Sequence, residues 1–377
     1  MLPVTLTGAS HCQWICQLLL PQSTEFEYIY VVQGGSGQAV TCREDRARRF
    51  TSPQLLSHDH QHQHLVIHND SPLRISNARA SWITTGLVGL EHKDFNCSLV
   101  SVVHLLFNFP KLRQRLIDTP QYKGRPYSSC LSTIFKDMEQ GQQTDLAGLR
   151  SLVALSSDAG EILNIILCEV IDEISRSNSV LDNNNMGIRH MFEGDLAKTA
   201  IVLDRNGNIE SVKSHSEKFV NIILPVRGFV SLEESLKVYQ HNIEQVGTTT
   251  FETIVAFDNM PDVFVVQLDR AHQQHDHHHY TKVTNRFSFP KRFIPVNQTV
   301  YGIKAIICHQ GDSLNDGHFF AYVRRGKQWL KCDGVSIEQV SRKMAFYDSF
   351  GGSPNDGQAY ILVYEKQDGS PTGAPAP

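Results

Sequence analysis

Residues 301–340 decide the expected fold, and they read YGIKAIICHQGDSLNDGHFFAYVRRGKQWLKCDGVSIEQV. The first part alternates as a β-strand does and puts four residues on one face: Tyr301, Ile303, Ala305 and Ile307. A polar loop containing glycines then delivers His318 to the start of a second strand, and a strand led by Trp329 returns to Asp333. Adjacent antiparallel strands joined by a short turn can bring His318 and Asp333 side by side.

A histidine at the start of a strand and an aspartate on its neighbour are typical of the base and the orienting group of a catalytic triad. The alternative interpretation is a loop histidine and a turn aspartate without a catalytic role. His318 and Asp333 have no nucleophile beside them in the sequence. The enzymatic interpretation therefore requires a nucleophile elsewhere in the chain.

The composition is that of a globular protein, with 377 residues of which 41% are hydrophobic and 20% charged. This length fits two or three average domains or one large domain with several lobes. The net charge of −4 argues against nucleic-acid binding. No apolar run approaches the roughly 20 residues of a membrane helix, and the start of the chain lacks the basic region of a signal peptide.

The eight cysteines are dispersed, which favours reduced thiols and a cytoplasmic or nuclear location over a disulfide scaffold. Cys12 and Cys16 have no matching second pair, and two His-rich segments, 58–68 and 272–280, are interpreted as polar loops. We therefore expect no metal and no cofactor. Residues 1–85, which include the β-rich segment 26–32, are expected to form a separate strand-rich extension of unassigned role. Residues 367–377 are expected to be a disordered tail.

A candidate nucleophile stands at the start of a predicted helix. Apolar residues recur there at the spacing of one helical face: Leu99, Val102, Val103 and Leu106. Cys97 directly precedes this face, where backbone N–H groups and the helix dipole favour a thiolate. The alternative is a small hydrophobic residue packed at a helix start.

The rest of the chain alternates between helices and strands. Helices are predicted over residues 161–175 and over residues 231–246, the second beginning at Ser231 with Glu234 three residues on as a capping box. A hairpin with Asn206 and Gly207 in its turn is expected. Buried strands are predicted at 262–270 and 359–366.

The order Cys97, His318 and Asp333 is that of papain-like thiol hydrolases. The segment GLVGLEHKDFNCSLVSVVHLLFNFPKLRQRL resembles the Cys box of the ubiquitin-specific proteases, and DGHFFAYVRRGKQWLKCDGVSIEQV resembles their His box. FEGDL, EKFVNIILPV, SLEESLKVY, VVQLDR and AYILVY follow the family's landmarks in their usual order. The resemblance covers residues 86–366.

The resemblance implies an α+β fold of the papain-like cysteine protease superfamily, arranged like a right hand. The thumb would span about 86–175, the fingers 176–255 and the palm 256–366. Ubiquitin or ubiquitinated proteins would be the partners, without nucleic acid or membrane. Cys97 would attack the carbonyl after the C-terminal glycine of ubiquitin, His318 would act as base and acid, and Asp333 would orient His318.

The sequence departs from the family in three places. The asparagine that the family uses to stabilise the oxyanion is not in place, because the position holds Gly89 when counted from Gly86 and His92 when counted from Cys97. His92 and Asn96 are the candidate substitutes. The second aspartate of the family's FDD is Gly334, and no cysteine lies between 168 and 308, so the zinc ribbon of the fingers is missing.

Two classes of function therefore stay open. The first is a thiol-dependent deubiquitinase. The second is a catalytically weak or inactive relative that binds ubiquitin as a scaffold module. A variant of the first is an isopeptidase for another ubiquitin-like modifier. The sequence does not indicate chain-linkage preference, protein substrate or oligomeric state.

Overall fold

The computed structural model describes residues 85–91, 96–118, 124–153, 156–176, 185–273, 280–295, 299–314, 316–352 and 357–367, together with the backbone of four short N-terminal strands. Contacts within the chain divide it into two units, Met1–Ser76 and Asn77–Pro377, and each is described by itself. In the first unit, β1 (Glu25–Tyr28) pairs with β4 (Arg48–Thr51), and β2 (Val31–Gln33) pairs with β3 (Val40–Arg43). The first His-rich segment lies outside the described residues.

The second unit is organised around a large sheet, called here the central sheet, with strand order β17-β16-β15-β14-β18-β10-β7 and β13 paired to β14. Its strands are β7 (Ile222–Pro225), β10 (Val263–Asp269), β13 (Arg292–Phe293), β14 (Tyr301–Gln310), β15 (His318–Arg325), β16 (Gln328–Asp333), β17 (Ser336–Val340) and β18 (Gly357–Lys366). Only β10 and β7 pair in parallel; the other neighbours are antiparallel.

A β-bulge in β14 overturns one expectation from the sequence. The register of β14 against β18 shifts between Ile303 and Ala305. Tyr301 and Ile303 therefore pack into the core on one side of the central sheet, whereas Ala305 and Ile307 pack into the core on the other side. The prediction that all four share one face is wrong, because one extra residue in a strand reverses the alternation that follows it.

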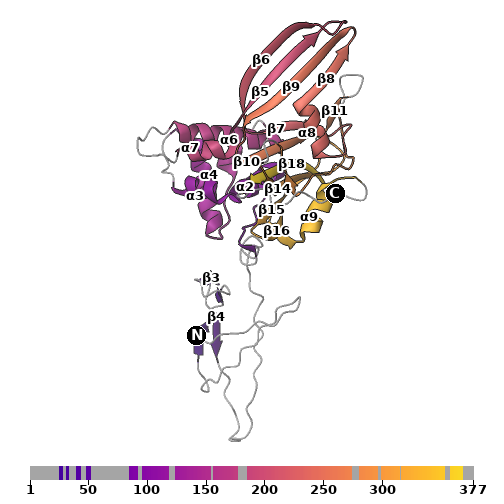
Figure 1. Cartoon of the computed structure of the whole chain (residues 1–377). Coiled ribbons are helices and arrows are strands. Elements are labelled where there is room, and N and C mark those ends of the chain that lie inside the picture. Colours follow the sequence, from indigo (N-terminus) through magenta and orange to yellow (C-terminus); the bar gives the residue numbers. More distant parts are fainter. Residues whose placement is uncertain are drawn as a thin grey trace, which may run out of the picture. The chain divides into compact units, whose positions relative to one another are not determined.

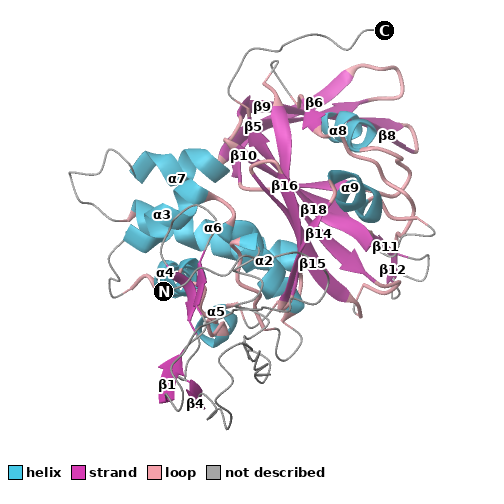
Figure 2. Cartoon of the chain, turned by 90° about the horizontal axis from the view of Figure 1, so that it is seen from below, coloured by secondary structure: helices cyan, strands magenta, loops and turns pink. Residues whose placement is uncertain are grey.

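Helices cover one face of the central sheet, as Figure 2 shows. They are called here the helix bundle: α2 (Cys97–Phe107), α3 (Pro110–Asp118), α4 (Pro126–Glu139), α5 (Ala147–Leu152), α6 (Ala159–Ser175) and α7 (Asn185–Phe192). Helix α2 lies against β14, β15 and β16, and its face is buried as predicted. The other face of the sheet carries α8 (Leu232–Gln240) and α9 (Arg342–Ser349) (Figure 2).

One helix of the bundle begins with a cap supplied from another helix. Glu173 on α6 is 3% exposed, and its two carboxylate oxygens accept the N–H groups of Tyr127 and Ser128 at 3.0 and 2.7 Å. These donors lie in the first turn of α4, where backbone N–H groups have no partner within the helix. The contact therefore fixes α4 against α6.

A second sheet projects from the central sheet, as Figure 1 shows. This finger sheet has the order β6-β5-β9-β8 and consists of β5 (Gly194–Leu203), β6 (Ile209–Phe219), β8 (His241–Val246) and β9 (Thr249–Asn259). The predicted hairpin joins β5 to β6, and Gly207 in its turn has a φ of 81°. Ser231 caps helix α8, and its hydroxyl accepts the N–H of Glu234, as predicted. The predicted extent of this helix is wrong, because α8 ends at Gln240 and residues 241–246 pair with β9 as strand β8.

The second His-rich segment is flanked by a short hairpin of β11 (Ala271–Gln273) and β12 (Tyr280–Lys282). Its central residues, 274–279, lie outside the described part of the chain. Within the described ranges, no group of three or more His, Cys, Asp or Glu residues is arranged to hold a metal ion. No described helix is both long and apolar enough to cross a membrane.

Candidate active site

The central sheet brings two of the predicted site residues together. His318 is the first residue of β15 and Asp333 is the last residue of β16, so both lie at the same end of adjacent antiparallel strands. The Nε2 of His318 lies 2.6 Å from the Oδ1 of Asp333, a distance typical of a charge-assisted hydrogen bond. Because Asp333 occupies Nε2, the other ring nitrogen, Nδ1, is the one left to face a nucleophile.

Cys97 is the first residue of α2, and it meets this pair from the helix bundle. Its Sγ lies 3.5 Å from the backbone nitrogen of Phe319, the residue after His318. The side chain is half-buried, and burial alone would raise the pKa of its thiol. Hydrogen bonds from His318 and from the N–H of Phe319 outweigh that effect, so the pKa of Cys97 lies below that of an ordinary thiol.

The charge of the imidazole is stabilised from both sides. The hydrogen bond to Asp333, followed by the one to Cys97, raises the pKa of His318 to about 9, against the opposing effect of burial. A lowered thiol pKa next to a raised imidazole pKa favours a thiolate–imidazolium pair at neutral pH. This arrangement can carry out nucleophilic attack followed by proton donation.

Sequence reasoning missed Lys331, which lies two residues before Asp333 and thus on the same face of β16. Its Nζ is 3.9 Å from the Oδ2 of Asp333 and 4.3 Å from the centre of the Phe320 ring. Lys331, Asp333, Ser336 and Glu338 line a recess of about 60 Å³, which is too small for a peptide substrate. The two-residue period of strands is the signal that could have identified Lys331.

The loop before His318 is held by backbone contacts. The ammonium of Lys282 donates hydrogen bonds to the carbonyls of His309 and Gly311, where β14 ends. At the other end of the loop, a side chain on Gly317 would come within 2.4 Å of the His309 ring. That ring stacks on Phe319, with 4.4 Å between ring centres. The loop therefore reaches His318 along a path that leaves no room for a side chain at 317.

The segment before Cys97 is fixed to the turn after Asp333. The N–H of Leu90 donates to the carbonyl of Gly334 at 2.9 Å, and Gly334 has a φ of 58°. A Cβ on Gly89 would lie 2.1 Å from the carbonyl oxygen of Val335, far inside van der Waals contact. Position 89 therefore has no room for a side chain.

Of the two candidate oxyanion residues, His92 and Asn96, the structure describes Asn96. His92 lies outside the described residues. Asn96 directly precedes Cys97, is 7% exposed, and does not use its side chain to cap α2. Its Oδ1 is buried and has no hydrogen-bond partner among the residues that the structure describes. The amide of Asn96 is therefore not committed to the helix that follows it.

Comparison with known proteins decides the family. The family model described as "Ubiquitin carboxyl-terminal hydrolase" matches residues 88–364, which is most of the chain and contains Cys97, His318 and Asp333. The chain belongs to the ubiquitin carboxyl-terminal hydrolase family. The membership predicted from the two sequence boxes is thus confirmed.

Relatives within the family are distant. The chain is 23% identical to ubiquitin carboxyl-terminal hydrolase 5 of Schizosaccharomyces pombe, over 76% of this chain and 29% of that protein. It is also 23% identical to ubiquitin carboxyl-terminal hydrolase 12 of Salmo salar, over 74% of this chain and 90% of that protein. Similarity to ubiquitin carboxyl-terminal hydrolase 13 of Saccharomyces cerevisiae, again 23% identical, covers 56% of this chain and 32% of that one. The chain thus spans about a third of the two yeast proteins.

A solved structure shows the same fold. A chain in a structure of the yeast SAGA DUBm matches with a TM-score of 0.60 and 19% sequence identity, over 75% of this chain and 69% of that one. The predicted α+β fold of the papain-like superfamily is confirmed by this likeness and by the family model. The position of the family's oxyanion asparagine would be Gly89 when counted from Gly86 and His92 when counted from Cys97. At the first of these positions, packing against Val335 leaves no room for a side chain.

Proposed function

We propose that this protein is a thiol-dependent deubiquitinase that cleaves the bond after the C-terminal glycine of ubiquitin. The observation that carries the proposal is the contact of His318 with Asp333 on one side and with Cys97 on the other. Family membership supplies the substrate class. Ubiquitin and ubiquitinated proteins are accordingly the proposed partners.

In the proposed mechanism the Cys97 thiolate attacks the carbonyl carbon of the terminal glycine, and a tetrahedral oxyanion forms. As the C–N bond breaks, the His318 imidazolium protonates the leaving lysine amine, and ubiquitin is left as a thioester on Cys97. His318 then takes a proton from water, which attacks the thioester and releases the carboxylate and Cys97. Asp333 accepts the N–H of His318 throughout and holds the ring in one orientation.

Two groups beside Cys97 could stabilise the oxyanion. The backbone N–H of Cys97 lies at the N-terminus of α2, where the dipole favours negative charge. The side-chain NH₂ of Asn96 is the second, because Asn96 directly precedes Cys97 and its side chain does not cap α2. We propose that Asn96 takes the place of the asparagine that position 89 cannot hold.

The direct test uses ubiquitin that carries an electrophile at its C-terminus. We expect one adduct per chain, mapped by peptide mass spectrometry to Cys97, because the lowered thiol pKa makes this the reactive cysteine. Chains that bind ubiquitin yet form no adduct would contradict the proposal. That result would instead support the scaffold module, which the closed position 89 favours by removing one oxyanion donor. Repeating the reaction with other ubiquitin-like modifiers would measure selectivity.

The pH dependence of the reaction follows from the two shifted groups. As pH rises, kcat/KM should first increase while Cys97 loses its proton, at a pH below the pKa of an ordinary thiol. Because the pKa of His318 is about 9, the imidazolium that protonates the amine persists through neutral pH and is lost above that value. We expect a bell-shaped profile whose alkaline limb lies near pH 9, measured with a fluorogenic ubiquitin substrate. A profile that still rises above pH 10 would contradict the assigned pair.

We also propose a reducing location, the cytoplasm or nucleus. Each of the five cysteines in the described ranges is a free thiol, namely Cys97, Cys130, Cys168, Cys308 and Cys332. Free thiols outside a disulfide framework are typical of such compartments.

A further inference from the structure

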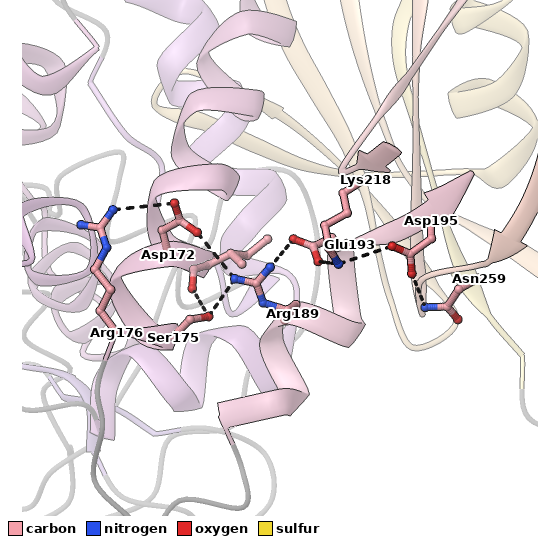
Figure 3. A network of polar contacts seen from close by, with 9 residues as sticks. Asp172, Ser175, Arg176, Arg189, Glu193, Asp195, Lys218 and Asn259 are labelled. Carbon is pink, nitrogen blue, oxygen red and sulfur yellow. Dashed lines mark hydrogen bonds and ion pairs between the residues drawn. The ribbon is translucent and has the colours of Figure 1, made fainter. Parts of the chain in front are cut away.

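A network of five alternating charges that ends in an asparagine connects the helix bundle to the base of the finger sheet, as Figure 3 shows. Its members are Asp172, Arg189, Glu193, Lys218, Asp195 and Asn259. The first two lie on α6 and α7, and the last three lie on β6, β5 and β9. Glu193 stands between these two groups, directly after α7 and directly before β5.

One carboxylate oxygen of Glu193 contacts the helix bundle, and the other contacts the finger sheet. Its Oε2 lies 2.6 Å from Nη1 of Arg189 on α7, and its Oε1 lies 2.6 Å from Nζ of Lys218 on β6. The side chain of Glu193 is only 11% exposed, so salt and water screen these contacts less than they screen a surface pair. Burial opposes ionisation, but the bonds from Lys218 and Arg189 outweigh it and lower the pKa of Glu193.

The network is anchored further on both sides. In the bundle, Nη2 of Arg189 donates to the hydroxyl of Ser175 at 3.2 Å and lies 3.6 Å from Asp172 on α6. This second contact ties α7 to α6.

In the finger sheet, Nζ of Lys218 is also 3.4 Å from the carboxylate of Asp195, which accepts a hydrogen bond from Asn259 at 3.4 Å. One carboxylate, Glu193, thus connects two helices to three strands. Networks of this kind are worth more than the same number of isolated surface pairs.

We propose that Glu193 is a positioning residue that fixes the orientation of the finger sheet relative to the helix bundle and thereby sets the affinity for a folded modifier. The inference rests on the proposed function. A folded protein substrate that contacts both the helix bundle and the finger sheet binds more tightly when the relative orientation of these two parts is fixed before binding. The partners of Glu193 belong to α7 and β6, whereas Cys97, His318 and Asp333 belong to α2, β15 and β16. Glu193 should therefore affect binding of the modifier and not the chemical step.

The test compares two substrates that carry the same fluorophore, whole ubiquitin and a short peptide that ends in Gly-Gly. For Glu193→Gln we expect KM for the ubiquitin substrate to rise roughly threefold to tenfold, as for loss of a charged hydrogen bond. We expect kcat for the ubiquitin substrate to stay unchanged. We also expect kcat/KM for the peptide to stay unchanged, because the peptide is too short to reach the finger sheet. Lys218→Met should act in the same direction, and the double variant should be no worse than the worse single one.

The matched control is Glu139→Gln, which removes the same charge from an ion pair with Arg113, 2.8 Å long and confined to α3 and α4 of the bundle. It should leave KM for both substrates unchanged. Ubiquitin affinity is measured separately by titration. Equal losses on ubiquitin and peptide, or no change in KM and affinity, would overturn the role of Glu193.

The binding measurement separates this inference from the proposed function. If the wild-type chain binds ubiquitin without cleaving it, the deubiquitinase proposal fails, and a threefold or greater loss of affinity in Glu193→Gln would still support the positioning role. If the wild-type chain neither cleaves nor binds ubiquitin, both proposals fail.

Discussion

Replacement of Cys97 by alanine should reduce hydrolysis of a fluorogenic ubiquitin substrate by at least about 10,000-fold, because removal of the nucleophile of a triad leaves only binding and oxyanion stabilisation. The fold should survive, since the change removes one small, half-buried group whose hydrogen bonds are to His318 and to the backbone N–H groups of Phe319 and Ser98. A thermal melt close to that of the wild type would show this. The variant should also keep its affinity for ubiquitin.

The control for Cys97 is Cys130→Ala. Cys130 on α4 is also a partly buried free thiol, but burial and the nearby Glu173 raise its pKa, so it is a poor nucleophile. Its replacement should leave kcat/KM unchanged. Residual turnover by Cys97→Ala within tenfold of the wild type would show that the nucleophile has been assigned to the wrong residue.

The second large effect is expected at Asp333. Asp333→Ala should lower kcat roughly 100- to 10,000-fold, because His318 loses the group that fixes its tautomer and orientation. The hydrogen bond to Asp333 is also the main cause of the raised pKa of His318. Its loss should move the alkaline limb of the kcat profile to lower pH, which a steady-state pH series would measure.

Two further variants separate the effect of Asp333 on the orientation of His318 from the effect of its charge. Asp333→Asn keeps an oxygen that can accept the N–H of His318, so its kcat should lie between those of the wild type and Asp333→Ala, while the alkaline limb should still move down. Glu338→Ala removes a carboxylate from the same recess without touching His318 and should change neither quantity. An unshifted alkaline limb in both Asp333 variants would mean that Asp333 does not tune His318.

Much of the site could be predicted because its parts are local in the sequence. The helix at Cys97 follows from apolar residues at helical spacing, and the strands of His318 and Asp333 follow from alternation around short turns. The capping residue Ser231 was likewise predictable from a four-residue signature. Each of these signals needs only a few neighbouring residues.

What could not be predicted depends on residues far apart in the chain. The cap that Glu173 places on α4 and the bridge from Glu193 to Lys218 join segments with no common pattern, so composition and periodicity do not reveal them. The bulge at Ile303 depends on how β14 pairs with β18. The crowding of Gly89 against Val335 likewise exists only once the two segments meet.

The close approach of Gly89 to Val335 has a consequence for any attempt to engineer an additional hydrogen-bond donor at position 89. An asparagine there would need the carbonyl of Val335 to move away, and that carbonyl lies in the turn beside Gly334, which accepts the N–H of Leu90. Gly89→Asn alone would therefore disturb the backbone next to Asp333 instead of adding a donor. A substitution that enlarges the donor set is better placed at Asn96, which lies outside this turn.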